Sequence, residues 1–531
     1  MNSNAMWQGR GDAPLGQASE LGALCFLATI VIVVVCFDSI TFADGDTNWH
    51  IATGRWILAH RAVPTVDPFS FTVPGRRWVA HEWLSEVVLA AVQAAGGWSA
   101  VQLLVGACAG AAMALMARTL RRMLGVLSVI ACVGLAFAIL RVHLLARPHM
   151  LALPLLVLWT AQMVEARRAG RPPPLWLAPL MTLWANLHGS YVFGLVFTVP
   201  FAIEAWRLAG PARPRALLGW GLFLGLAGLA ALINPNGVDD VLLPLQVMRL
   251  GVLQDIGEWK PTDLAHISPL VMALFLALFV CLYRGVRFGW ERLSLLLLLL
   301  FMTFQHGRQE IILAAAGPLL LAQPLGAVLE PARAAPASGR ASAWTFRSWA
   351  ALGAAAALVV AIGAWRLGHP VRRVDSGTTP VAALAHVPPA LRGAPVFNSY
   401  SFGGWLILNG VRPFVDGRAD MYGDTFVRLA LDTEAADPPA QALATLRRYG
   451  VVWSITTPGS GLIPLLDRTP GWRRLYEDRW AVVQVYQPAL DARSGARAAR
   501  PSMSGESGSG FAARTCAKCL KWSPSGSDES I

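Results

Sequence analysis

Runs of apolar residues, separated by polar connections, fill the chain from residue 21 to residue 367. Most of these runs have the length and apolar character of helices that cross a lipid bilayer. We predict eleven crossings, at about residues 21–41, 84–117, 124–140, 150–164, 175–187, 192–206, 217–233, 270–283, 293–304, 311–329 and 349–367. The run 84–117 is too long for one simple crossing and Gly96-Gly97 interrupts it, so we expect an interfacial helix that leads into a membrane-spanning one.

The pattern changes after the last run. Between residues 368 and 490, strand-like stretches at 451–455 and 481–486 alternate with a helical pattern at 440–449. These features predict a small extramembrane α/β domain. From residue 491 to residue 531, Ala, Arg, Gly and Ser dominate, so we expect a disordered tail, and its lone pair Cys516 and Cys519 does not indicate a redox site.

The composition sets the class of the protein. Of 531 residues, 55% are hydrophobic and only 14% are charged, which excludes a soluble enzyme of this size. We therefore predict a polytopic α-helical membrane protein with about eleven transmembrane helices over residues 21–367. The formal net charge of +12 does not indicate a nucleic-acid partner, because the arginines are scattered between apolar runs rather than gathered in one basic domain.

Arginine positions predict how the chain is oriented. Every second connection carries three arginines: 118, 121 and 122; 167, 168 and 171; 207, 213 and 215; 284, 287 and 292; 333, 340 and 347. The positive-inside rule places these connections, and with them residues 1–20, in the cytoplasm. An odd number of crossings then places the domain at 368–490 on the outer side, which is the periplasm if the protein lies in a bacterial inner membrane.

Unusual polar residues gather at the opposite, outer ends of the predicted crossings. Acidic, histidine, amide and arginine side chains meet there: Asp44, Asp46, His50, His81, Glu82, Arg147, His149, Asn186, His188, Asn234, Glu258, His306, Arg308 and Glu310. This asymmetry indicates a membrane protein with a working face. The long first outer loop, residues 42–83, carries the densest set.

Asp44 and Asp46 begin that loop. Two carboxylates two residues apart can converge on one cation, Mg²⁺ or Mn²⁺, or one of them can hold a proton while its neighbour stays ionised. The alternative is that they only cap the next helix, because Asp is favoured at helix N-termini. That helix, from His50 to His60, has the pattern of one lying flat in the interface with its tryptophans at headgroup level.

A second polar pair, His81 and Glu82, ends the first outer loop. It extends the set of groups that can move a proton. The alternative is a surface ion pair of Glu82 with Arg76 or Arg77, which contributes little.

The first outer loop resembles that of bacterial membrane glycosyltransferases of the C superfamily, a group that includes protein mannosyltransferases, aminoarabinose transferases and the catalytic subunit of oligosaccharyltransferase. The motifs that carry the resemblance are D-x-D-x-x-W-H at 44–50, G-x-W-I-L at 54–58, P-x-x-D-P-F-S at 64–70 and E-W-L at 82–84. Further motifs of one mostly uncharacterised branch lie at 147–150, 184–189, 234–237 and 258–259, and in the outer domain at 398–405 and 416–424. The resemblance implies Asp46 or Asp44 as the working acid.

Such enzymes take a sugar from a polyprenyl phosphate, so the resemblance implies a lipid-linked donor and a lipid, glycan or protein acceptor. A phosphate leaves without protonation, whereas an acceptor hydroxyl gains from a carboxylate base, for which Asp46, Asp44 or Glu82, with His81 beside it, would serve. Attack opposite the phosphate would invert the anomeric carbon. A metal at Asp44 and Asp46 would assist the phosphate, but that spacing alone is weak support for one.

Basic groups at the outer ends of the crossings are candidates to bind the donor phosphate. They are His50, Arg147, His149, His188, His306 and Arg308. Each has a structural alternative: an arginine at a span end can snorkel to headgroups, and a histidine can satisfy a helix end.

The remaining polar motifs favour structural roles. We expect residues 234–237 to form a turn with Asp239 and Asp240 as its solvated flank, and residues 416–424 to form a Gly-rich turn rather than a sugar site. Two other functions stay open for the whole chain: a transporter or lipid carrier, and a non-catalytic membrane-anchored assembly protein. A transporter predicts ionisable residues at mid-span depth, whereas here they cluster at span ends.

Overall fold

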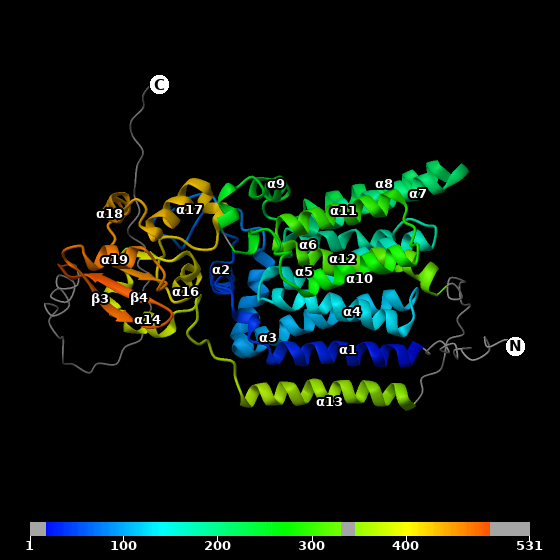
Figure 1. Cartoon of the computed structure of the whole chain (residues 1–531), viewed down its shortest axis with the longest axis horizontal. Helices are drawn as coiled ribbons and strands as arrows, with labels where there is room; N and C mark the ends of the chain where they lie inside the picture. Colours follow the sequence, from blue (N-terminus) through cyan, green and yellow to red (C-terminus); the bar gives the residue numbers. More distant parts are fainter. Residues whose placement is uncertain (1–16, 256, 331–345, 489–531) are drawn as a thin grey trace, which may run out of the picture.

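The computed structural model describes residues 17–255, 257–330 and 346–488. It has two parts, a bundle of long helices and a smaller α/β module (residues 371–488) at one end of the bundle (Figure 1). The first sixteen residues and the segment from residue 489, which includes the predicted tail with Cys516 and Cys519, lie outside the described residues.

Each predicted crossing corresponds to a helix. The bundle helices are α1 (Gln17–Phe37), α3 (Trp83–Arg121), α4 (Val126–Leu140), α5 (Pro148–Arg168), α6 (Pro179–Leu187), α7 (Tyr191–Leu208), α8 (Arg213–Ala231), α10 (Pro269–Tyr283), α11 (Trp290–Gln305), α12 (Glu310–Leu329) and α13 (Phe346–Gly368). Seven of them, α1, α3, α4, α5, α7, α8 and α12, are long and apolar enough to cross a membrane when the 3-10 turns joined to three of them are counted. A multi-pass helical membrane fold is thus confirmed, and the total of eleven crossings stays a prediction.

The expected break in the long run lies inside α3. Gly96 and Gly97 leave the helical conformation there, and Gly97 has φ +63°, a backbone angle that residues with a Cβ rarely adopt. C-terminal to the break, α3 packs closely on α1. A Cβ atom at Gly110 would come within 2.7 Å of the carbonyl oxygen of Ala28. Small residues allow this approach between membrane helices.

The first outer loop contains helix α2 (Asp46–His60), which lies between α3 and the module helix α16 (Gly403–Leu408). The prediction that this helix lies flat in the membrane interface is wrong for its first half. Trp49 is only 7% exposed because it packs with side chains of the module, whereas His50 and Ile51 are buried on the side of the bundle. In the second half, Leu58 is exposed.

The module contains a mixed four-stranded sheet with strand order β1-β2-β4-β3. Its strands are β1 (Val396–Asn398), β2 (Trp453–Thr456), β3 (Trp472–Glu477) and β4 (Val482–Tyr486); β1 is parallel to β2, and β4 is antiparallel to both β2 and β3. Helices α14 (Val381–His386), α15 (Pro389–Arg392), α16, α17 (Ala419–Ala435), α18 (Pro439–Arg448) and α19 (Leu462–Asp467) pack around it. The predicted strands are present, whereas the domain bounds 368–490 and the extramembrane location stay predictions.

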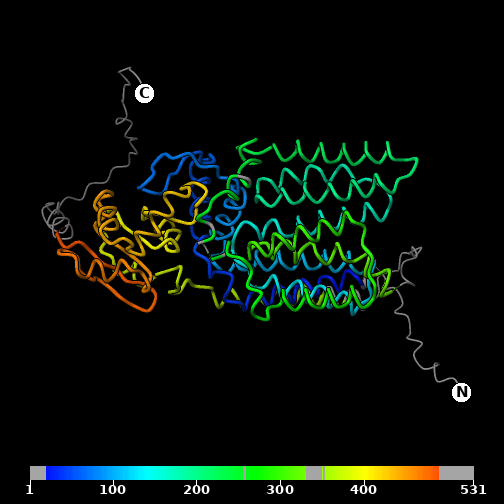
Figure 2. The backbone as a smooth tube through the Cα atoms, turned by 45° about the horizontal axis from the view of Figure 1, so that its top comes forward, coloured from blue at the N-terminus to red at the C-terminus, as the bar shows by residue number. Residues whose placement is uncertain are grey.

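Three connections between bundle helices lie at the end of the bundle that is next to the module. The first outer loop, blue in Figure 2, lies against the yellow and orange module. The connection from α8 to α10 meets the same end and contains α9 (Val238–Val247) and the 3-10 helices η5 (Gly251–Asp255) and η6 (Gly257–Trp259). A third 3-10 helix, η7 (Gly307–Gln309), joins α11 to α12 there. The two aspartates at 44 and 46 therefore lie on the same side of the bundle as the module.

Candidate functional site

The first outer loop and the module approach each other at three glycines. A Cβ atom at Gly45 would come within 2.5 Å of the carbonyl oxygen of Ser401, and one at Gly404 would collide with the carbonyl oxygen of Gly45. A Cβ at Gly417 would collide with the carboxylate of Asp46. The module backbone is therefore one wall of the space around the aspartates.

Arg147 pairs with both aspartates. It occupies the N-cap of α5 in an extended conformation, and its Nη1 lies 3.1 Å from Oδ2 of Asp44 while its Nη2 lies 2.6 Å from Oδ2 of Asp46. The other oxygen of Asp44 accepts a hydrogen bond of 3.1 Å from the backbone N–H of Asp46. The N-cap of α2 is Gly45, which has no side chain to cap the helix. Helix capping therefore does not account for both Asp44 and Asp46.

Glu82, immediately before α3, is the meeting point of three histidines. Its Oε1 lies 3.3 Å from Nε2 of His188 and 3.7 Å from Nε2 of His81, and its Oε2 lies 3.8 Å from Nε2 of His50. The Nδ1 atom of His188 accepts a hydrogen bond from the backbone N–H of Ser190. A neutral His188 therefore carries its proton on Nε2, the atom that faces Glu82.

Burial sets the protonation of this centre. It raises the pKa of Glu82 above its ordinary value, although the charges of His81, Arg147 and Arg308 oppose the rise. Burial also lowers the pKa of His50 and of His188 well below the ordinary value, so both are neutral at pH 7.

His81 behaves in the opposite way. Burial lowers its pKa, but Glu82, Asp420 and Asp240 outweigh that effect, so the net shift is upward. His81 is thus the histidine of this group that most readily carries a positive charge.

The acids after α8 differ from expectation. Arg77 pairs with Asp239 on the surface and Glu82 faces histidines, so the alternative of a surface ion pair between Glu82 and Arg76 or Arg77 is wrong. Asp240 is only 2% exposed, which corrects the prediction of a solvated flank. The turn at 234–237 is confirmed, since Oδ1 of Asn234 accepts from the backbone N–H of Asn236 and its carbonyl oxygen accepts from the N–H of Gly237.

Arg308 and His149 border the centre, whereas His306 lies to one side. The guanidinium of Arg308 stacks 4.4 Å from the ring centre of Trp259, and its charge acts on Glu82 and His188. The ring of His149 lies 6.2 Å from that of His188, and its Nε2 donates to the carbonyl oxygen of His143 at 2.9 Å. His306 donates from Nδ1 to the carbonyl oxygen of Trp259 at 2.8 Å.

Three acidic residues of this region were not among the site residues that the sequence predicted. Glu86 lies one turn after Glu82 on α3, is 1% exposed and has its Oε1 3.2 Å from Nδ1 of His50. Its spacing of four residues from Glu82 was the available signal, because such residues share a helix face. Asp240 and Asp420, both close enough to act on His81, were assigned to turns.

A second charged cluster lies beside the first and fixes the loop to the module. Arg418 is fully buried; its Nε and Nη2 each donate to Asp416 at 2.7 Å and its Nη1 donates to Asp67 at 2.8 Å. The hydroxyl of Tyr422 donates to Asp416 at 2.8 Å, and the guanidinium stacks 4.8 Å from the ring centre of Trp78. Residues 416–424 thus form a clamp on the first outer loop rather than an isolated Gly-rich turn.

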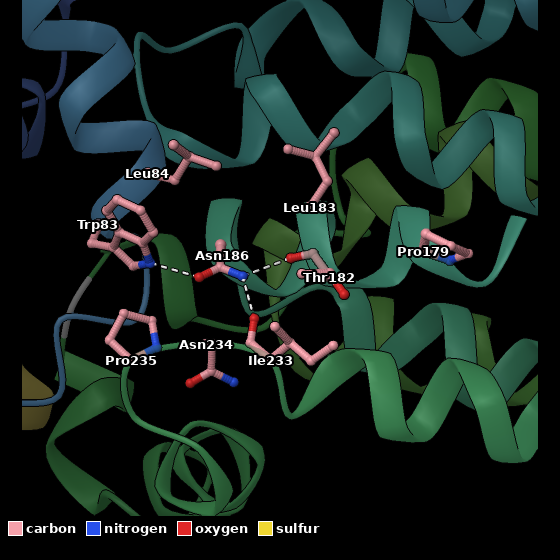
Figure 3. Close-up of a pocket in the computed structure, with 9 residues that line it drawn as sticks. All are labelled: Trp83, Leu84, Pro179, Thr182, Leu183, Asn186, Ile233, Asn234 and Pro235. Carbon is pink, nitrogen blue, oxygen red and sulfur yellow. Dashed lines mark hydrogen bonds between the residues drawn. The ribbon is translucent and has the colours of Figure 1, made fainter.

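An apolar groove of about 710 Å³ opens beside the centre, between α3, α6 and the end of α8 (Figure 3). It is lined by Trp83, Leu84, Pro179, Thr182, Leu183, Asn186, Ile233, Asn234 and Pro235. The indole of Trp83 donates to Asn186 at 2.7 Å, and Asn186 in turn donates to the carbonyl oxygens of Thr182 and Ile233 at 2.7 and 2.9 Å. Trp83, at one end of this lining, follows Glu82 directly in the chain, so the groove lies next to the helix turn that carries the carboxylate.

The fit of a metal ion to Asp44 and Asp46 is poor. Both carboxylates already face the guanidinium of Arg147, and among residues 17–255, 257–330 and 346–488 no group of three or more His, Cys, Asp or Glu is arranged to hold a metal. These two carboxylates are therefore better matched to the arginine than to a metal ion.

Comparisons with known proteins give a likeness in structure alone. No protein-family model matches the chain, and no curated protein matches it. Archaeal oligosaccharyltransferase AglB from Archaeoglobus fulgidus, solved with an inhibitory peptide and a dolichol-phosphate, matches over 82% of this chain and 69% of its own, at 13% identity and a TM-score of 0.50. ArnT from Cupriavidus metallidurans bound to undecaprenyl phosphate matches over 88% and 98%, at 14% identity and a TM-score of 0.48.

The likeness to AglB shows that this chain shares the fold of that oligosaccharyltransferase, as the sequence motifs led us to expect. The chain is a multi-pass membrane protein of this fold. At this level of identity the likeness assigns no role to any residue.

Proposed function

We propose that this protein is an integral-membrane glycosyltransferase of the bacterial inner membrane. It moves a sugar from a polyprenyl-phosphate donor to a lipid, glycan or protein acceptor on the outer face, with inversion at the anomeric carbon. The N-terminus is then cytoplasmic and the module periplasmic. The fold supports the proposal, because AglB has this fold and was solved with dolichol-phosphate.

The observation that carries the proposal is the convergence of three histidines on Glu82, where the bundle meets the module beside the apolar groove. A carboxylate whose pKa is raised toward neutrality is an effective general base. Glu82 would take the proton of the acceptor hydroxyl as the oxygen attacks the anomeric carbon. The bond from that carbon to the phosphate oxygen breaks, and the lipid phosphate leaves with the electron pair.

The two aspartates have a different role in this proposal. Both carboxylates already face one guanidinium, so an acceptor hydroxyl would have to compete with Arg147 for them. Asp44 and Asp46 therefore hold Arg147 in place, 3.1 and 2.6 Å from its nitrogens, rather than remove the acceptor proton. Glu82 replaces them as our first candidate for the base.

Arginines and the groove supply the donor site. Arg147 and Arg308 both act on Glu82 through their charges, so a phosphate bound near them would lie close to the base. The apolar groove has room for part of a prenyl chain and begins at Trp83. His149 and His188 lie at the same end of the bundle, but their Nε2 atoms already face the carbonyl oxygen of His143 and Glu82, so the two arginines are the candidates for the phosphate.

The test compares the carboxylates one at a time in the purified full-length protein. Glu82→Gln, Asp46→Asn and Asp44→Asn are assayed for transfer from radiolabelled polyprenyl-phosphate sugars to membrane extracts. We expect Glu82→Gln to lose at least about a hundredfold in rate, the low end of what a general base contributes. Glu165→Gln is the matched control, because Glu165 pairs with Arg122 at the opposite end of the bundle.

Two results would contradict the proposal. Full activity of Glu82→Gln would remove Glu82 as the base. Uptake of the labelled donor into vesicles without any transfer by the wild type would favour a lipid carrier instead.

A further inference from the structure

Glu86 is a buried carboxyl group for which the proposed reaction has so far no use. It is 1% exposed and lies on the same face of α3 as Glu82, one turn along the helix. Its Oε1 lies 3.2 Å from Nδ1 of His50, and its Oε2 has no hydrogen-bond partner in the described part of the chain. No arginine or lysine of that part lies within ion-pair distance of Glu86.

His50 stands between the two glutamates. Its Nδ1 faces Glu86, while its Nε2 faces Oε2 of Glu82 at 3.8 Å. Its ring cannot move far, because α2 and α3 touch at Gly54, where a Cβ atom would collide with the backbone carbonyl of Glu86. The order Glu86, His50, Glu82 is therefore built into the packing of the two helices.

The chemistry of the surroundings decides where the proton of His50 lies. A carboxyl group sealed from water without a cationic partner favours its neutral form, which carries an O–H donor. Burial and then the charges of Arg147 and His81 lower the pKa of His50 well below its ordinary value, so its ring is neutral. With Glu86 donating to Nδ1, the single ring proton must sit on Nε2.

We infer that Glu86 is a positioning residue for sugar transfer: it fixes the tautomer of His50, which then presents its Nε2–H to the carboxylate of Glu82. The inference rests on the proposed function. His188 is the counterpart on the other oxygen, since the backbone N–H of Ser190 fixes its tautomer and its Nε2 lies 3.3 Å from Oε1 of Glu82. Each oxygen of Glu82 thus faces the Nε2 atom of a histidine.

During transfer the positioning groups keep their protons. The acceptor O–H breaks and its proton goes to Glu82, the new bond to the anomeric carbon forms, and the lipid phosphate departs with the electrons of the broken bond. Glu86 and His50 act only by holding Glu82 in the geometry that meets the acceptor, and that geometry carries much of the rate.

Two substitutions of similar size separate this role from a general effect on folding. The amide of Glu86→Gln can still donate to Nδ1 of His50, whereas Glu86→Met cannot. We expect kcat of Glu86→Gln to stay within about threefold of wild type and that of Glu86→Met to fall about a hundredfold, with KM unchanged in both. Glu165→Met, the same change at the far end of the bundle, is the matched control.

The alternatives give distinct results. Wild-type rates in both variants would show that Glu86 has no role in transfer. Equal losses in both would show that a charged carboxylate, not a neutral donor, is needed, and would overturn the assignment.

A second measurement needs no turnover. The thermal midpoint of the purified full-length protein is measured for Glu86→Met, for His50→Phe and for both together. We expect the loss caused by Glu86→Met to vanish in the His50→Phe background, because the contact is already gone. Additive losses would overturn this inference alone, whereas a wild type that transfers no sugar would overturn the proposed function.

Discussion

Two charged clusters lie side by side where the first outer loop meets the module, and they are built in opposite ways. In the cluster around Arg418, the guanidinium nitrogens have carboxylate partners at 2.7–2.8 Å and its side chain is fully buried. In the cluster around Glu82, one carboxylate faces three histidines at 3.3–3.8 Å. In the first cluster each charge has a close partner of opposite sign. In the second cluster the protonation of the carboxylate and the histidines can change.

A buried atom without a hydrogen-bond partner also distinguishes the Glu82 cluster from the Arg418 cluster. Near Glu82, Oε2 of Glu86 is buried without a hydrogen-bond partner among the described residues. A buried polar group without a partner is costly and is expected mainly where function needs it. We therefore assign the Arg418 cluster to stability and the Glu82 cluster to chemistry.

The largest effect that tests this division is on stability. Arg418→Met would leave Asp67 and Asp416 buried without their cation, and breaking a buried ion pair from one side costs about 3–5 kcal/mol. We expect a large fall in the thermal midpoint of the purified protein. The pKa of Asp67 bears on the same point: burial opposes its ionisation, but Arg418 and the bonds from Ser70 and Phe69 outweigh it and hold the pKa below its ordinary value.

Arg474 is the matched control for that substitution. It also pairs with two acids of the module, Asp467 and Glu477, but it is 42% exposed. Arg474→Met should cost no more than about 1 kcal/mol, as exposed pairs do. Similar losses for the two arginines would break the contrast between a buried and an exposed cluster.

Gly417 joins the two clusters and gives the next largest effect. It lies between Asp416 and Arg418, yet a Cβ there would collide with the carboxylate of Asp46. Gly417→Ala should push Asp46 away from Arg147, and a displacement of about 1 Å at a reacting site can cost about a hundredfold in rate. We expect kcat for transfer to fall by that order while the module stays folded.

Gly459→Ala is the control, because a Cβ at Gly459 meets no atom within 4 Å. Both variants are compared in the transfer assay and in thermal melts. Equal rates for the two would show that the module backbone does not shape the space around Asp46.

The sequence predicted the fold better than the site. Apolar runs are long and repeat along the chain, so each predicted crossing has a helix, and the break at Gly96-Gly97 follows from glycine itself. The gathering of Asp44, Asp46, Glu82, Arg147 and His188 at one end also followed from alternating crossings. Their fine pairing did not, because single side chains from different helices meet only after packing.

The failures have physical causes as well. Glu86 lies inside an apolar run, where a lone acid gives no local signal, although its spacing from Glu82 offered one. Asp239 and Asp240 are neighbours in sequence, yet only Asp240 turns inward. The burial of Trp49 depends on a module that lies more than 300 residues away in the chain, which no local pattern on α2 reports.

The smallest expected effect concerns pH and tests whether the protonation of Glu82 controls the transfer rate. The charge of His81 opposes the rise that burial causes in the pKa of Glu82. His81→Gln should therefore raise that pKa further, so the acid limb of the transfer rate, where Glu82 must be ionised, should move about one unit to higher pH. Rates measured from pH 5 to pH 9, roughly the range that brackets histidine and raised glutamate values, would resolve the shift.

His60→Gln is the control for this shift, since His60 is exposed at the end of α2 and bonds the carbonyl oxygen of Trp56 in its own helix. Its acid limb should match that of the wild type. If His81→Gln also leaves the limb in place, Glu82 does not titrate in the reaction and the base must be sought at Asp44 or Asp46. A limb that moves to lower pH would instead mean that the charge on His81 is not what opposes the burial of Glu82.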